Sequence, residues 1–115
     1  MIRRSNELQQ VTQPKMKGGA GALESTHFLQ ADEFCGKGRL FAHGRLRPGS
    51  SVGLHKHEKD FEVYHILRGR GMYNDDGTMQ PVGPGDVTIC LEGQSHALDN
   101  TGDEDLEYIA LILYA

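Results

Sequence analysis

Turn-forming residues divide most of this chain into short segments. Glycine, proline, aspartate and asparagine recur at 48–49, 69–71, 74–77, 84–86 and 101–105, and the chain contains 15 glycines in 115 residues. The segments between them are rich in β-branched and aromatic residues, which favour strands. They leave no room for the crossover helices of a parallel sheet. The pattern therefore predicts an all-β fold of about eight to ten short strands in a sandwich or barrel.

Two of the expected strands have clear side-chain patterns. Residues 86–91 alternate between polar and apolar side chains, which is typical of a half-buried strand. Within it, we expect Cys90 to be a small buried hydrophobe. Residues 106–114 are apolar on both faces, so we expect this strand either at the centre of a sheet or beneath another subunit.

The length of the chain sets its domain organisation. A chain of 115 residues forms one domain with a modest core. Residues 1–22 are polar and end in a glycine-rich run, so we expect an arm that is either disordered or lies on a partner subunit. Residues 23–115 are expected to form the β domain.

Charge and hydropathy argue against several classes of partner. The formal net charge is −4 and no basic stripe covers phosphates, which argues against nucleic acid. We expect the small basic group of Arg39, Arg45 and Arg47 to lie on one solvated strand face. No apolar run is long enough to cross a membrane or to form a signal peptide. Because Cys35 and Cys90 are not a close pair in sequence, we expect reduced thiols and a cytoplasmic location.

Three histidines and one glutamate are the strongest candidates for chemistry. His55 and His57 are two residues apart in an expected strand, so their imidazoles point to the same side. Glu62 follows after a short turn, and His96 begins a later strand. Imidazole and carboxylate groups together suit a divalent transition metal such as Mn, Fe, Co, Ni or Zn. Without a metal, burial of these side chains among apolar neighbours would be costly.

These residues lie in two stretches that resemble the two sequence motifs of the cupin superfamily. The positions that carry the resemblance are Gly49, His55, His57, Glu62 and Gly69 in the first stretch, and Gly85, Leu91, Gly93, His96 and Asn100 in the second. The separation between the stretches, residues 70–84, is similar to that of small microbial cupins. Leu91 stands where the family usually has proline, a position that shapes the loop and does not bind metal.

The resemblance implies both a fold and a cofactor. The fold would be a jelly-roll β-barrel of two antiparallel sheets with little helix. The cofactor would be one divalent transition metal ion (Mn, Fe, Ni or Zn), held by His55, His57, Glu62 and His96. A homodimer is also implied, because single-domain cupins commonly pack their sheets together and exchange N-terminal strands.

A metal site of this kind leaves three functional hypotheses open. Three imidazoles and one carboxylate leave the ion with net positive charge and open positions, which favours a small anionic acid as ligand. The first hypothesis is a small metal-dependent enzyme of the oxygenase, decarboxylase or isomerase type, with no catalytic residue assigned. The second is a non-catalytic binding or sensor module, which a cavity without a general acid or base would favour. The third is a structural or storage barrel without a cavity.

Few other residues are candidates for the pocket. His43 and Phe41, on the strand before the first motif, are candidates for its wall. His65 is expected to point away from the pocket and His27 into solvent. Asp60 is either a partner that orients an imidazole or a loop charge.

Overall fold

Ten strands and three short 3₁₀ turns make up the regular structure of the computed structural model, which describes residues 1–115. The strands are β1 (Gln9–Pro14), β2 (Ala22–His27), β3 (Gly38–Leu46), β4 (Ser51–Lys56), β5 (Asp60–Arg68), β6 (Gly71–Asp75), β7 (Thr78–Val82), β8 (Val87–Cys90), β9 (Ser95–Asp99) and β10 (Leu106–Tyr114). The turns are η1 (Ser5–Glu7), η2 (Met16–Gly18) and η3 (Ala31–Phe34). None of these helical segments has the length and hydropathy that a membrane-spanning helix needs.

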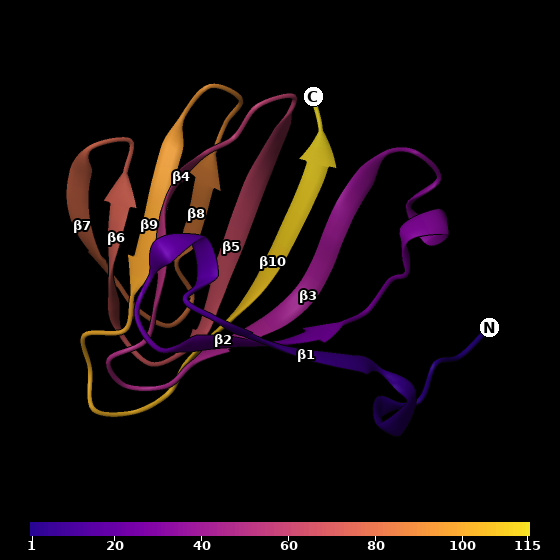
Figure 1. Ribbon diagram of the computed structural model, residues 1–115, viewed down its shortest axis with the longest axis horizontal. Coiled ribbons are helices and arrows are strands. Elements are labelled where there is room, and N and C mark those ends of the chain that lie inside the picture. Colours follow the sequence, from indigo (N-terminus) through magenta and orange to yellow (C-terminus); the bar gives the residue numbers. More distant parts are fainter.

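The strands form two antiparallel sheets (Figure 1). The larger sheet has six strands in the order β1-β2-β3-β10-β5-β8, and the smaller has four in the order β4-β9-β6-β7. Both sheets are antiparallel throughout, and the chain moves between them repeatedly. The prediction of an all-β fold with two antiparallel sheets is confirmed.

The hairpin between β6 and β7 shows how local sequence sets the connections. Asp76 and Gly77 at its tip both have positive φ, 49° and 101°, which is the conformation that a tight two-residue hairpin turn requires. The Asn74 side chain accepts a hydrogen bond from the Gly77 amide at 2.8 Å. The turn residues noted in the sequence therefore close this hairpin.

Strand β10 is central to the larger sheet. It pairs with β3 on one side and β5 on the other. Tyr108, Ala110 and Ile112 are buried on its inner face, whereas Ile109 and Leu111 on its outer face are half-buried. Of the two positions expected for this doubly apolar segment, the structure has it at the centre of a sheet.

The most closely packed part of the apolar core lies apart from a cavity between the sheets. Its most completely buried members come from four different strands and have no exposed surface: Leu46, Ile66, Leu98 and Leu106. None of the four lines this cavity, whereas other members of the same apolar cluster, such as Tyr64 and Tyr108, do. Cys90 is 2% exposed, as expected of a small buried hydrophobe, and both cysteines are free thiols.

The direction of three side chains on β3 differs from our expectations. Phe41 and His43 point to the outer face of the sheet, where His43 Nε2 lies 3.0 Å from a Glu107 carboxylate oxygen, and neither lines the central cavity. Arg39 was expected on a solvated face with Arg45, but it lines the cavity. The cause is a break in register, because β10 pairs Ile112 with Leu40 but the next residue with Gly38. The extra residue in β3 turns Arg39 inward.

Candidate metal centre

A bulge in β4 places the first histidine. β4 pairs with β9 as Val52 with Leu98 and His55 with His96, so two residues of β4 lie opposite one residue of β9. The bulge changes the alternation of the strand, and Val52 and His55 therefore both point inward although they are three residues apart. The carbonyl oxygen of Gly53, inside the bulge, accepts a hydrogen bond of 2.7 Å from Nδ1 of His55.

The second histidine lies just beyond β4 and is fixed by backbone pairing. The His57 amide donates to the Gln94 carbonyl at 3.0 Å, and the His57 carbonyl accepts from the Gly93 amide at 2.8 Å. These bonds tie His57 to the loop that leads into His96. Glu62 reaches the same point from β5, where it pairs with Ile112 of β10.

Four side-chain atoms converge at this point, all within 4.8 Å of one another. Oε1 of Glu62 lies 3.0 Å from Nε2 of His57 and 3.0 Å from Nε2 of His96. Nε2 of His96 lies 3.1 Å from the Nε2 atoms of both His55 and His57. Adjacent ligands about 2.1 Å from an octahedral ion lie about 3 Å apart. The separations therefore fit adjacent ligand positions around one ion.

Each imidazole is also held through its other nitrogen. Nδ1 of His55 donates to the Gly53 carbonyl, and Nδ1 of His57 donates to Oδ1 of Asp60 at 2.7 Å. Nδ1 of His96 lies 2.8 Å from the hydroxyl group of Tyr73. Such partners fix the tautomer and ring orientation of metal-binding histidines. All three Nε2 atoms are thus directed at the centre.

The imidazole nitrogens and the Glu62 carboxylate form a group of atoms that a bound cation would stabilise. Because the Gly53 carbonyl and the Asp60 carboxylate only accept, the Nδ1 atoms of His55 and His57 carry the hydrogen of the neutral rings. Their Nε2 atoms then present lone pairs beside the Glu62 carboxylate. Lone pairs at these separations repel one another unless a positive charge lies among them. The residues therefore fit a divalent transition metal.

Burial and charge shift the pKa values of these groups in different directions. Burial alone would raise the pKa of Glu62, but the three histidines hold it far below its usual value, because a protonated ring donates to the carboxylate. The Glu62 carboxylate raises the pKa of His57 in the same way, whereas burial lowers the pKa of His96. Burial opposes ionisation of Asp60, yet His57 and Arg39 lower its pKa. The centre thus holds two ionised carboxylates beneath the protein surface.

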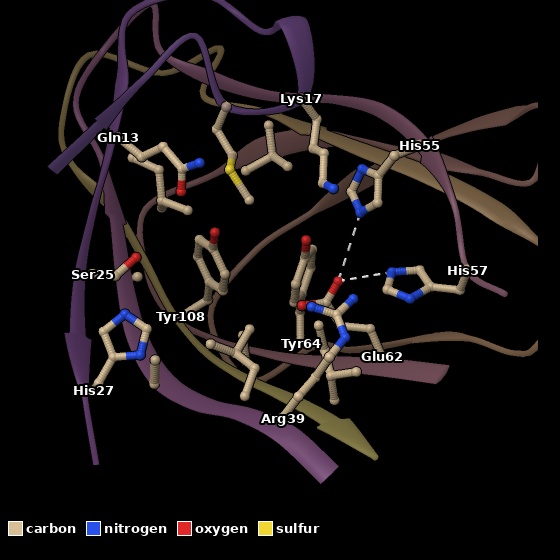
Figure 2. Close-up of a pocket in the computed structure, with 18 residues that line it drawn as sticks. Gln13, Lys17, Ser25, His27, Arg39, His55, His57, Glu62, Tyr64 and Tyr108 are labelled. Atoms are coloured by element: carbon tan, nitrogen blue, oxygen red, sulfur yellow. Dashed lines mark hydrogen bonds and ion pairs between the residues drawn. The ribbon is translucent and has the colours of Figure 1, made fainter. Parts of the chain in front are cut away.

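A cavity of about 430 Å³ opens beside the centre (Figure 2). The larger sheet forms most of its wall, and the β1–β2 hairpin covers it. Lys17 lies at the tip of this hairpin. Its carbonyl group packs so closely against Gly53 of β4 that no side chain fits at position 53. Lys17 has a positive φ of 52° and extends its side chain into the cavity near His55 (Figure 2).

The structure brings together all four residues expected as metal ligands and also adds residues to the site. Asp60 contacts His57, the first of the two roles considered for it. His27 lines the cavity, contrary to the expectation that it lies in solvent. Tyr73, Lys17 and Arg39 were not expected at the site. Only strand pairing, a hairpin tip and a bulge bring them there, and none of these has a clear sequence signal.

Comparisons with known proteins agree with this geometry. The family model for the cupin domain, Cupin_2, matches residues 42–112. The oxalate-binding protein of Thermotoga maritima is 46% identical over 113 residues, covering 98% of this chain and 93% of that protein. A crystal structure described as a predicted oxalate decarboxylase, also from Thermotoga maritima, has a TM-score of 0.94 at 45% identity, with 100% of both chains covered. A cupin-2 domain from Rhodospirillum rubrum shares the fold, with a TM-score of 0.77 at 16% identity over 100% of this chain and 74% of that one.

Proposed function

This chain belongs to the cupin family, and from that premise we propose that it binds a divalent transition metal ion and, on that ion, a small dicarboxylic acid such as oxalate. The observation that carries the proposal is the convergence of His55, His57, Glu62 and His96 at one end of a cavity. A divalent ion held there supplies positive charge and open positions for two carboxylate oxygens. The name of the oxalate-binding relative supports the same ligand class.

The cavity wall favours an anionic ligand. Glu62 is the only acidic side chain among the residues that line the cavity, and it belongs to the metal centre. Lys17 and Arg39 contribute positive charge at the same end of the cavity (Figure 2). Arg39 is paired with Asp60 at 2.9 Å, whereas Lys17 extends toward His55. A dianion on the ion would therefore meet cations rather than carboxylates.

The same wall favours binding over catalysis. Proton transfer to or from a bound acid needs a group that changes its charge near neutral pH. Tyr64 and Tyr108 line the cavity, but burial raises the pKa of both hydroxyl groups, so they stay protonated. No carboxylate other than Glu62 lines the cavity. Outside the metal centre, the lining groups that can exchange a proton are Lys17 and His27, and His27 lies across the cavity from Glu62, away from a short acid on the ion. The enzyme hypothesis remains a prediction, and release of carbon dioxide or formate from oxalate would establish it.

Calorimetry on metal-loaded and metal-stripped protein tests the proposal. Protein reconstituted with Mn, Fe, Ni or Zn is expected to hold about one ion per chain and to bind oxalate, and chelator-treated protein is expected to bind none. Acetate is the matched control, because it lacks the second carboxylate needed for chelation. Metal content far below one ion per chain after reconstitution, or oxalate binding that does not depend on metal, contradicts the proposal.

We also propose that two copies of the chain pair through the outer face of the larger sheet. Phe41, Leu111, Val63 and Ile89 are consecutive cross-strand neighbours on β3, β10, β5 and β8. They form one apolar row on the outer face, and Ile89 is 54% exposed. Rows of this kind on a small domain mark contact surfaces. The arm of residues 1–22, whose strand β1 is exposed along its whole length, is proposed to lie against the partner.

Light scattering after gel filtration tests the pairing. The wild type is expected to elute as a dimer and Val63→Lys as a monomer, because the lysine puts charge in the centre of the apolar row. Met79→Lys is the control, since Met79 is 54% exposed on β7 of the other sheet. A wild-type monomer at all concentrations contradicts the proposal.

A further inference from the structure

The cavity is larger than a two-carbon acid requires. Its volume of about 430 Å³ lies in the range of cavities that hold ligands of drug size. Oxalate on the ion would occupy only the end formed by the histidines and Glu62. The remaining space lies between this end and β2.

The wall opposite the metal centre is polar. Ser25 and His27 project from β2 into the cavity and lie across it from Glu62 (Figure 2). The side-chain hydrogen bonds of β2 involve Glu24 on the outer face rather than these two residues. A hydroxyl and an imidazole thus face the cavity, where a ligand can accept hydrogen bonds from them.

The floor between the two polar ends is apolar. Leu40 and Ala42 of β3 and Ala110 and Ile112 of β10 line it. Two strands separate β2 from β5 in the sheet, so three spacings of about 4.8 Å give about 14 Å along the curved wall. An acid of two carbons held at the ion therefore does not reach His27.

We propose that the cavity binds an extended dicarboxylic acid, with one end on the metal ion and the other on Ser25 and His27. This inference rests on the proposed function, because one end of the ligand requires the ion. The apolar floor accommodates a methylene chain of about three carbons. The far end is a carboxylate because Glu62 is the only acidic group that lines the cavity, so a second anion meets donors and no opposing charge.

Calorimetry on the metal-loaded full chain with three acids tests the inference. The probes are oxalate, 2-oxohexanoate and 2-oxoadipate; the two six-carbon acids differ only in a terminal methyl or carboxylate group. The wild type is expected to bind 2-oxoadipate about tenfold more tightly than 2-oxohexanoate, as for a hydrogen bond to a charged group. In His27→Ala this preference is expected to disappear, with oxalate affinity within about twofold of the wild type. His65→Ala, with its side chain exposed on the opposite face of the same sheet, is the control and keeps the preference.

A second variant separates loss of the contact from loss of space. Ala42 pairs with His27 and lies on the apolar floor, so Ala42→Leu fills the path to the far wall. It is expected to weaken both six-carbon acids about tenfold and to leave oxalate unchanged. Metal-dependent oxalate binding without a preference for 2-oxoadipate, or a preference that persists in His27→Ala, overturns this inference alone. If no acid binds the metal-loaded protein, the proposed function fails and this inference fails with it.

Discussion

The two halves of the space between the sheets are built from the same strands but differ in content. On β9, Leu98 is fully buried in the core, and His96, two residues earlier, points into the metal centre. On β5, Ile66 lies in the core half and Glu62 in the open half. Apolar packing fills one half, while the other combines an apolar floor with polar groups that close packing would exclude. On β5 and β9, the fully packed residues and the metal-centre residues therefore lie at different points along the same strand.

Leu98→Ala is expected to have the largest effect on stability. Leu98 has no exposed surface, and deletion of a fully buried leucine side chain costs about 2–5 kcal/mol because it leaves a cavity. Urea denaturation of the metal-free variant measures the loss. A loss below about 1 kcal/mol would contradict the assignment of stability to the closed half.

His96→Ala is the matched change in the open half of the same strand. We expect metal affinity to fall more than about 100-fold, beyond the loss typical of a residue that only orients a ligand. The metal-free variant should lose less stability than Leu98→Ala, because the change also takes one polar ring out of a buried polar cluster. Elemental analysis and urea denaturation test the two parts, and unchanged metal content would remove His96 from the ligand set.

Asp60→Asn changes a residue at the edge of the metal centre. The carboxylate of Asp60 accepts from Nδ1 of His57 and pairs with Arg39. Loss of its charge is expected to weaken metal binding about 10- to 100-fold, as for other groups that orient metal-binding histidines. Glu58→Gln, in the adjacent exposed loop, is the control and should leave metal affinity unchanged. Competition against a chelator of known affinity measures both variants.

Glu24→Gln is expected to have the smallest effect, seen only in acid. Glu24 on β2 accepts hydrogen bonds from Arg47, just beyond the neighbouring strand β3, and from Arg45 on that strand. These bonds hold the pKa of Glu24 below its usual value. A lowered pKa contributes stability above the ordinary value of 4.5, and this contribution is lost as the pH falls through the lower native value. As the pH falls below 4.5, denaturation midpoints should therefore drop more steeply in the wild type than in the variant. Parallel curves would show that Glu24 does not hold β2 in place.

The sequence predicts the elements better than their pairing. The strands and turns follow from alternation and turn chemistry, which are local properties of the chain. His55, His57, Glu62 and His96 were identified because their spacing matches two motifs. The faces of β3 were also recognisable, since Leu40 and Ala42 share the apolar side, so the outward direction of Phe41 and His43 could have been deduced.

Other parts of the site depend on contacts between distant segments. Arg39 turns inward because of a bulge against β10, and His27 reaches the cavity because β2 pairs with β3 beside Ala42. Tyr73 meets His96 because β6 and β9 are neighbours in the smaller sheet. No local pattern encodes these pairings, since each depends on which strands become neighbours.

The central place of β10 also affects the order in which the protein folds. β3 and β5 do not pair with each other, and each is hydrogen-bonded to β10 instead. During synthesis the larger sheet therefore remains in two pieces until residues 106–114 have been made. One piece consists of β1, β2 and β3, and the other is the pair of β5 with β8. Every residue of the metal centre precedes that point in the chain. Because such non-local pairings form slowly, the cavity wall, which draws on both pieces, is complete only when the last strand joins them.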